Sequence, residues 1–251
     1  MLRPGTFALT LLLSLLTALG PLSMDMYLPA LHGMVGIYAA VANANHMATW
    51  GGTELLLGTN PLAIGVPSGP GPIVLDMATS IVAYGTVKKY ALRDLAMPEG
   101  WFVNPETGEA ITDPKRSHEG VLLPMGEYKG SGLSLMLGLL SGVLNGAAFG
   151  RDVVDFNADD SSETNTGHFI IVADVARFIG RETFIAEVDR HVRDFKQSKR
   201  LPGVDEIRLP GDRRRECRAE RSRDGVPIAP ALMAQLDKLA AELSVTPLRE
   251  R

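Results

Sequence analysis

The chain has 251 residues, 45% of them apolar, and its 25 basic and 29 acidic residues give a formal net charge of −4. This length suits one large domain or two modest ones with a real core, and the charge balance excludes the strongly basic surface of a nucleic-acid-binding protein. The single cysteine, Cys217, excludes an internal disulfide and favours a reducing compartment. C-x-x-C, H-E-x-x-H and calcium-loop motifs are absent, so the sequence predicts no metal site.

Residues 7–22, FALTLLLSLLTALGPL, form an uncharged and almost wholly apolar segment after Arg3. The segment is shorter than the ~20 residues of a transmembrane helix but longer than most signal-peptide cores. With the following GPLSMDMYLPAL it resembles the end of the first membrane helix of Bcr/CflA-type drug-resistance transporters, and nothing downstream continues that resemblance. We interpret residues 1–32 as a transporter-like segment of membrane type, whose residues 7–22 are suited to contact with a membrane. The alternative is a buried apolar helix of a soluble fold.

Short apolar runs bounded by glycine and proline predict core strands. We expect a strand in GMVGIYAAVANA, two strands in LAIGV and PIVLDM joined by the turn PSGPGP, and a later strand in FIIVADV. Apolar residues at 82, 83, 87 and 91 predict a helix over residues 79–93, with Thr79 and Ser80 as possible N-caps. NPETGE predicts a small hairpin.

Residues 126–150, GEYKGSGLSLMLGLLSGVLNGAAFG, form a second apolar peak without charge from Ser131 to Phe149. Hydropathy alone allows a membrane span, but glycines and an asparagine interrupt the run. We interpret it as a helix buried inside a soluble domain.

Polar and amphipathic segments complete the chain. Residues 152–168 are acidic and predict a solvated loop. Apolar residues at 184, 188, 192 and 195 predict a one-sided amphipathic helix with His191 beside the apolar stripe. A dense charge run carries arginines at 213, 214, 215, 218, 221 and 223, and Leu232, Leu236, Leu239 and Leu243 mark one face of a last helix.

Glycine-containing turns provide candidate functional sites. Asp76 ends a predicted strand in VLDMATS, and in EYKGSGL the residues Lys129 and Gly130–Ser131–Gly132 open the apolar helix. Free N–H groups at a helix N-terminus, with a lysine nearby, suit an anion, although a lysine there commonly just faces solvent. Neither a Walker A loop nor a Rossmann fingerprint is present. The residues alone predict an α/β domain with phosphate cradles.

A series of motifs from about Gly33 to Leu243 resembles the malate/L-lactate dehydrogenase-like family. In order, the motifs are WGG…LLGTNPLAIGVP, VLDMATS, PEGW, TDP, LLPMGEYKGSGLSLMLGLLSGVLNGAAFG, GHFIIVAD, and LPGD with its basic run. The resemblance implies an α/β (α+β), non-Rossmann fold with a largely antiparallel sheet, used as a homodimer, and makes residues 33–251 an NAD(P)-dependent oxidoreductase domain. It implies hydride transfer between NAD(P)H and a small 2-oxo, 2-hydroxy or 2-imino acid.

The resemblance also implies which residues contact the cofactor: Asn43, Asp76, Met77, Ala78, Lys129, Gly211 and Arg213. Glu127 replaces a glycine common in the family motif and adds a negative charge near the proposed cradle. NAD and NADP both stay open, because the arginines near Arg213 suit either a 2′-phosphate or a solvated face.

The family's N-terminal third has no counterpart here. It carries a Ser-His-Gly stretch with an arginine that grips the substrate, and an Asn-His-Phe-Gly-type motif with the proton-exchanging histidine. NHM at 45–47 is similar to the latter, but MATWGG and GTNP follow at once. We therefore expect His46 to be a loop residue near the cofactor and assign no catalytic residue.

Three functional hypotheses follow. The first is a cytoplasmic oxidoreductase, incomplete at its N-terminus, and the alternative is an inactive truncated remnant that retains cofactor binding or dimerisation. The third is a membrane-anchored protein whose function follows the transporter-like segment. The expected partners are a small 2-oxo or 2-hydroxy acid and a second copy of the chain, without nucleic acid. Membrane association through residues 7–22 is the alternative location.

Overall fold

A computed structural model describes residues 33–159, 161–163 and 165–250. The predicted transporter-like segment, residues 1–32, lies outside these ranges. Within them, no helix combines the length and apolar character that crossing a membrane requires.

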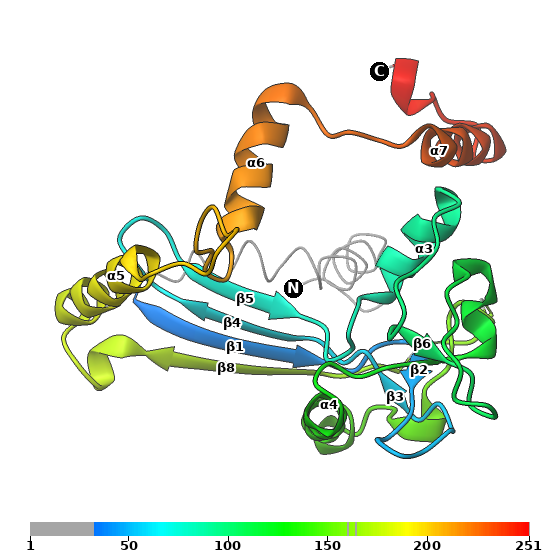
Figure 1. The fold of residues 1–251 in the computed structure, drawn as a ribbon, viewed down its shortest axis with the longest axis horizontal. Coiled ribbons are helices and arrows are strands. Elements are labelled where there is room, and N and C mark those ends of the chain that lie inside the picture. Colours follow the sequence, from blue (N-terminus) through cyan, green and yellow to red (C-terminus); the bar gives the residue numbers. More distant parts are fainter. Residues whose placement is uncertain (1–32, 160, 164, 251) are drawn as a thin grey trace, which may run out of the picture.

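A four-stranded antiparallel sheet forms the centre of the fold (Figure 1). Its strand order is β5-β4-β1-β8, and its members are β1 (Met34–Ala40), β4 (Leu62–Val66), β5 (Ile73–Met77) and β8 (His168–Asp174). Ile37 of β1 lies opposite Ile64 of β4 and Ile171 of β8. The four predicted strands, the β4–β5 turn and the antiparallel character are confirmed.

A smaller region beside the sheet holds the hydrophobic core (Figure 1). Two short antiparallel ladders build it: β2 (Asn45–Met47) with β3 (Leu57–Gly58), and β6 (Phe102–Val103) with β7 (Val121–Leu122). Helix α3 (Tyr84–Leu92) and the 3-10 helix η1 (Pro114–Glu119) join them. The buried cluster consists of Met47, Leu57, Val87, Met97, Phe102, Ile111 and Leu122. The predicted NPETGE hairpin is present, since the N–H of Asn104 donates to the carbonyl of Glu109 at 2.8 Å.

Helix α3 begins later than predicted. Residues 79–82 run beside the segment before α4, where Ser80 pairs with Pro124 in a β-bridge and the N–H of Ile81 donates to Leu123 at 2.8 Å. The hydroxyl of Thr79 donates to the carbonyl of Thr59, and that of Ser80 to the carbonyl of Val82. Thr79 and Ser80 are therefore not N-caps, because tertiary pairing holds them in extended backbone.

The helix predicted to be buried within residues 126–150 is present, but it is shorter and less buried than expected. Helix α4 covers Tyr128–Ser141, and the 3-10 helices η2 (Val143–Asn145) and η3 (Gly150–Asp152) follow. Small residues such as Ser134 and Gly138 line its buried face, whereas Leu135, Met136 and Leu139 are exposed. The side-chain amide of Asn145 donates to the carbonyl of Ser141 at 2.9 Å and thereby closes the helix end.

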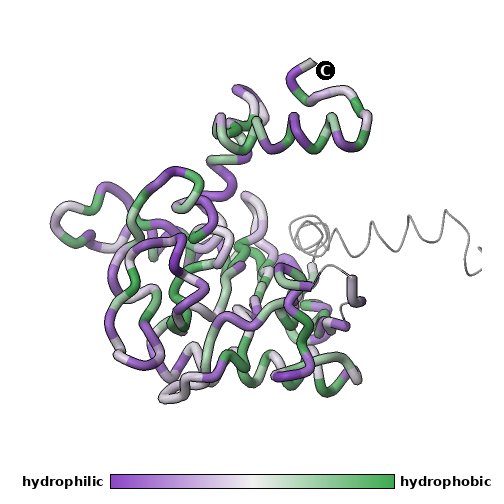
Figure 2. Tube along the Cα trace, turned by 90° about the vertical axis from the view of Figure 1, so that its right-hand side faces the viewer, coloured by the Kyte–Doolittle hydropathy of each residue, from purple (hydrophilic) through white to green (hydrophobic). Residues whose placement is uncertain are grey.

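The C-terminal part contains three helices: α5 (Arg181–Gln197) after the 3-10 helix η4 (Val175–Arg177), α6 (Asp212–Asp224) and α7 (Pro230–Glu242), with a last 3-10 turn η5 (Leu248–Glu250). The predicted amphipathic helix and last helix are confirmed. The arginine-rich charge run is helix α6, which rises from the sheet beside β5 (Figure 1). Helix α7 stands apart from the sheet in both views (Figures 1 and 2).

Candidate functional site

The cleft between β5 and α6 is a strongly charged hollow. Its volume is about 490 Å³, and its lining residues are Val74, Leu75, Asp76, Arg208, Leu209, Pro210, Gly211, Arg213, Arg214, Cys217 and Arg221. Four of these side chains are arginines and one is a carboxylate. The cleft unites three predicted cofactor residues, Asp76, Gly211 and Arg213. We call it the α6 cleft.

The segment LPGD brings α6 against β5. Gly211 has φ +92°, a conformation that favours glycine, and an added Cβ would lie 3.3 Å from both the N and the O of Val74. The absence of a side chain therefore allows this turn to approach the backbone of β5. The close approach places the first turn of α6 beside Asp76.

Asp212 anchors the start of α6. Its carboxylate accepts the N–H of Leu209 at 2.9 Å, lies 2.9 Å from the ammonium of Lys196, and pairs with Arg215. Burial alone would raise the pKa of Asp212, but these hydrogen bonds lower it to about 2. Asp212 thus stays ionised at neutral pH and ties the end of α5 to the base of the α6 cleft.

Ion pairs in and beside the α6 cleft involve partly exposed arginines. Arg214 lies 2.7 Å from Asp76, whose side chain is 22% exposed, and Arg213 lies 3.5 Å from Glu216, whose side chain is 44% exposed. An exposed pair such as Arg213–Glu216 contributes about 0–1 kcal/mol. An arriving anion can therefore compete with Glu216 for Arg213, because guanidinium groups bind phosphate in two-pronged geometry.

The N-terminus of α4 lies against the strand-end residues. The N–H of Met125 donates to the carbonyl of Thr79 at 2.9 Å, and the N–H of Gly130 donates to Met125 at 2.9 Å. Gly130 lies inside the first turn of α4, so the predicted Gly130–Ser131–Gly132 turn is part of the helix. The predicted residues Met77 and Ala78 are half-buried just before this contact, and Lys129 is exposed on the first turn. Lys129 does not line the α6 cleft.

A buried polar network positions the loop of Asn43. Asn60 is fully buried; its side-chain oxygen accepts the N–H of Ala42 at 3.0 Å, and its amide donates to the carbonyl of Ser134 at 3.0 Å. Asn43 itself is exposed, and its carbonyl accepts the N–H of Phe156 at 3.3 Å. Asn60 was not among the residues predicted for the site. The available signal was the asparagine in GTNP, a polar residue between apolar runs.

Glu127 occupies a backbone conformation that favours glycine. Its φ is +60° and its ψ is −123°, and such strain costs about 1–3 kcal/mol. We expect Glu127→Gly to raise the free energy of unfolding by about 1 kcal/mol, since the greater freedom of glycine in the unfolded chain offsets part of the gain. Urea denaturation measures this change in the free energy of unfolding. The control variant Glu106→Gly should lower the free energy of unfolding, because Glu106 has no positive φ. Equal changes in the free energy of unfolding in both variants would show that the backbone of Glu127 is not strained.

His46 lies outside the α6 cleft. Its ring stacks on Tyr84 with centroids 3.8 Å apart. Burial lowers the pKa of His46, nearby Asp155 opposes that shift, and Lys88 adds to it. No histidine lines the α6 cleft within the described part of the chain.

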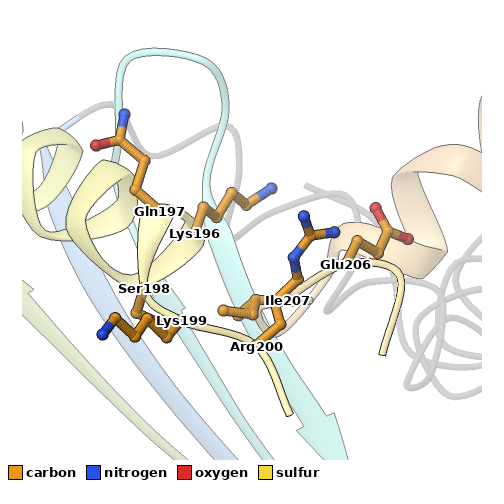
Figure 3. A pocket seen from close by; sticks show the side chains of 7 residues that line it. All are labelled: Lys196, Gln197, Ser198, Lys199, Arg200, Glu206 and Ile207. Carbon is orange, nitrogen blue, oxygen red and sulfur yellow. The ribbon is translucent and has the colours of Figure 1, made fainter. Parts of the chain in front are cut away.

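A larger, open hollow lies at the end of α5 (Figure 3). Its volume is about 820 Å³, and its lining includes Lys196, Lys199, Arg200 and Glu206. The side chain of Lys199 extends away from that of Lys196 (Figure 3), and Lys196 already pairs with Asp212. Because its cations do not converge, this hollow is a weaker candidate for an anion than the α6 cleft.

The fold and the cleft together define a mixed α/β protein with an arginine-rich surface suited to anions. Residues 16–237 match the model of the malate/L-lactate dehydrogenase family, and the chain belongs to that family. It is similar to the malate dehydrogenase of Pyrococcus horikoshii, with 33% identity over 85% of this chain and 60% of the relative. It is also similar to the Delta(1)-pyrroline-2-carboxylate reductase of Ancylobacter novellus, with 34% identity over 84% of this chain and 61% of the relative.

The architecture agrees with the family. The crystal structure of malate dehydrogenase from Entamoeba histolytica matches with a TM-score of 0.79 and 29% identity, covering 87% of this chain and 64% of that one. The chain thus spans less than two thirds of the length of these proteins.

Proposed function

We propose that the chain binds a nicotinamide cofactor through the α6 cleft and transfers hydride between NAD(P)H and a small 2-oxo or 2-hydroxy acid. The observation that carries the proposal is the meeting of Asp76, Gly211 and Arg213 in one arginine-lined cleft. Membership of a family whose members include malate dehydrogenases and a cyclic imino-acid reductase supports it.

The residues present fit the adenosine end of such a cofactor. Arg213, Arg214 and Arg221 offer guanidinium groups to phosphate oxygens, and Asp76 offers a carboxylate to ribose hydroxyls. The glycine turn at Gly211 packs against the backbone of β5 and so holds the arginines at the start of α6 beside Asp76. The bound cofactor would supply or accept the hydride, while this chain's residues bind and orient it. Four arginines against one carboxylate favour NADP(H) over NAD(H).

A cofactor-binding protein without turnover is the second candidate. The observation that favours it is the placement of His46, which stacks on Tyr84 instead of lining the α6 cleft. A hydride transfer without a positioned proton donor loses a factor of about 10²–10⁴ in rate.

We further propose that the protein is a cytoplasmic homodimer, in keeping with the family resemblance.

Fluorescence titration of the protein with NADPH and NADH tests cofactor binding. We expect Arg213→Ala and Arg214→Ala each to weaken NADPH binding at least tenfold, because hydrogen bonds to charged groups contribute about 1.5–3 kcal/mol. Arg218→Ala is the matched control, since Arg218 lies on the same helix but does not line the cleft. Equal losses in all three variants, or no binding of either cofactor, would refute the assignment.

Turnover separates the two candidates. Absorbance at the reduced nicotinamide band is followed after addition of oxaloacetate, pyruvate and pyrroline-2-carboxylate. Oxidation of the cofactor supports the oxidoreductase, and binding without oxidation supports the second candidate.

A further inference from the structure

Strand β8 forms an open edge of the central sheet (Figure 1). The opposite edge strand, β5, is covered, because the turn at Gly211 packs against the backbone of Val74. Within the described part of the chain, no strand pairs with the outer side of β8. An edge strand presents a row of unpaired N–H and C=O groups to which a further strand can bind. We call the outer side of β8 the β8 edge.

The hydrogen bonds between β1 and β8 show which backbone groups point outward. The N–H of Val41 donates to the carbonyl of Gly167 at 3.1 Å, and the N–H of Val175 donates to the carbonyl of Gly33 at 3.0 Å. The register between these two bonds is continuous. Because the residues that face a given neighbour alternate along an antiparallel strand, residues 169, 171 and 173 also face β1. The N–H and C=O groups of residues 168, 170, 172 and 174 therefore point to the β8 edge.

Three consecutive apolar residues at the centre of β8 are exposed. The exposed fractions are 64% for Ile170, 44% for Ile171 and 50% for Val172. Edge strands are commonly protected by charged residues, by proline or by a bulge. The centre of β8 has none of these, since its residues are all β-branched and its register with β1 does not shift. The β8 edge is thus suited to pairing with another strand.

The sequence of β8 is complementary to itself in the antiparallel orientation. Paired residues must lie on the same face of a sheet, and successive side chains alternate between the faces. A twofold axis perpendicular to the sheet therefore passes through a pair of identical residues. An axis at Ile171 places this residue opposite its own copy and places Ile170 opposite Val172 of the second copy. Every central pair then consists of two β-branched apolar residues, which are favourable cross-strand partners.

The ends of β8 carry complementary polar side chains in the same register, because His168 lies opposite Asp174 of the second copy. Nδ1 of His168 is hydrogen-bonded to the hydroxyl of Tyr38, which leaves Nε2 for that carboxylate. Asp174 accepts the N–H of Ala176 at 3.0 Å with one oxygen and retains capacity for a second donor. The carbonyl of His168 already accepts the amide of Asn145 at 2.7 Å. Backbone pairing is therefore centred on residues 170 and 172.

We propose that two copies of the chain pair through their β8 edges and join their central sheets into one continuous antiparallel sheet. The N–H and C=O groups of Ile170 pair with those of Val172 of the second copy, on both sides of the twofold axis. Ile171 meets its own copy at the axis as a non-hydrogen-bonded pair, in which side chains lie closest. This interface rests on the homodimer proposed above and is independent of hydride transfer.

Sedimentation velocity of the purified full chain, without cofactor, tests the proposal. We expect the wild-type chain to be dimeric and Ile171→Lys to raise the dissociation constant of the dimer at least tenfold, because two like charges would meet at the axis. Val172→Pro should weaken the dimer similarly, since it removes an outward N–H and leaves the ladder with β1 intact. The matched control is Val226→Lys, which alters a 67% exposed apolar residue outside β8 and should retain the wild-type dissociation constant.

Disulfide cross-linking tests the register in a Cys217→Ser background. Ile171→Cys should form a disulfide-linked dimer under mild oxidation, because Cα atoms of a non-hydrogen-bonded pair lie about 4.5 Å apart, within disulfide reach. Ala173→Cys is the control on the same face of β8. It should not cross-link, because this register places Ala173 opposite Phe169 of the second copy.

Several results would overturn the proposal: a monomeric wild-type chain, wild-type dissociation constants in Ile171→Lys and Val172→Pro, an equal loss in Val226→Lys, or equal cross-linking from positions 171 and 173. Circular dichroism should show that all variants fold. A wild-type dimer that survives both changes in β8 refutes this interface and leaves the homodimer standing. Cofactor titration and turnover test the proposed hydride transfer separately.

Discussion

Gly130→Ala is expected to lower the free energy of unfolding by about 3 kcal/mol, the upper part of the range for overpacked sites. A Cβ at Gly130 would lie 2.3 Å from the O of Met125, 2.7 Å from its N, and 2.7 Å from the O of Thr79. All three are backbone atoms, so no side chain can rotate away. Relieving these contacts requires the first turn of α4 to move away from Met125 and Thr79, which disrupts the hydrogen bond from the N–H of Gly130 to the carbonyl of Met125.

Urea denaturation of Gly130→Ala beside Gly132→Ala measures this effect. Gly132 belongs to the same helix, and nothing lies within 4 Å of an added Cβ there. Gly132→Ala should be neutral or stabilising by up to about 1 kcal/mol, because alanine favours the helix. Similar unfolding midpoints for the two variants would show that α4 does not pack closely on the strand-end residues.

Asn60→Ala is expected to cost about 2 kcal/mol, because the N–H of Ala42 loses its acceptor and an unsatisfied polar group costs about 1–3 kcal/mol. The N–H of Ala42 would stay half-buried without the Asn60 oxygen, whereas the carbonyl of Ser134 lies inside α4 and keeps its intrahelical partner. The change also loosens the loop that carries Asn43. Hydrogen exchange at the amide of Ala42 should therefore accelerate together with the loss of stability.

Asn104→Ala provides the comparison for Asn60→Ala. The side chain of Asn104 also makes two hydrogen bonds, to the N–H groups of Glu106 and Thr107, but it does so in an exposed turn. Water replaces these bonds, so we expect a cost of only about 1 kcal/mol. If the two variants lose equal stability, burial of the Asn60 network is not what stabilises this region.

Residue patterns within a short stretch of sequence predicted those helices and strands that neighbouring residues determine. The β4–β5 hairpin follows from two apolar runs around a Gly/Pro turn, and α5 follows from a one-sided apolar stripe. The start of α3 was mispredicted because the Thr79–Ser80 pair matches a capping pattern, yet a distant partner, Pro124, determines its backbone. Periodicity also does not distinguish buried from half-exposed faces in α4, where apolar residues surround the whole helix.

The candidate site depends on contacts that no local pattern contains. Asp76 and Arg214 are 138 positions apart in the sequence, and the α6 cleft exists only where their segments meet. Family resemblance directed attention to Asp76, Gly211 and Arg213, and the structure brings those three together. Asn60 belongs to the GTNP motif, but the motif alone does not show that its side chain joins the N–H of Ala42 to the carbonyl of Ser134.

Cys217 has a practical consequence for solution studies. It is the chain's only cysteine, it is half-buried, and it lines the α6 cleft between Arg213 and Arg221. A thiol-reactive fluorophore or spin label therefore has a single attachment point in the unmodified protein, located at the proposed cofactor site. Protection of this thiol from labelling by an added nucleotide provides a direct measure of occupancy that is independent of any catalytic step.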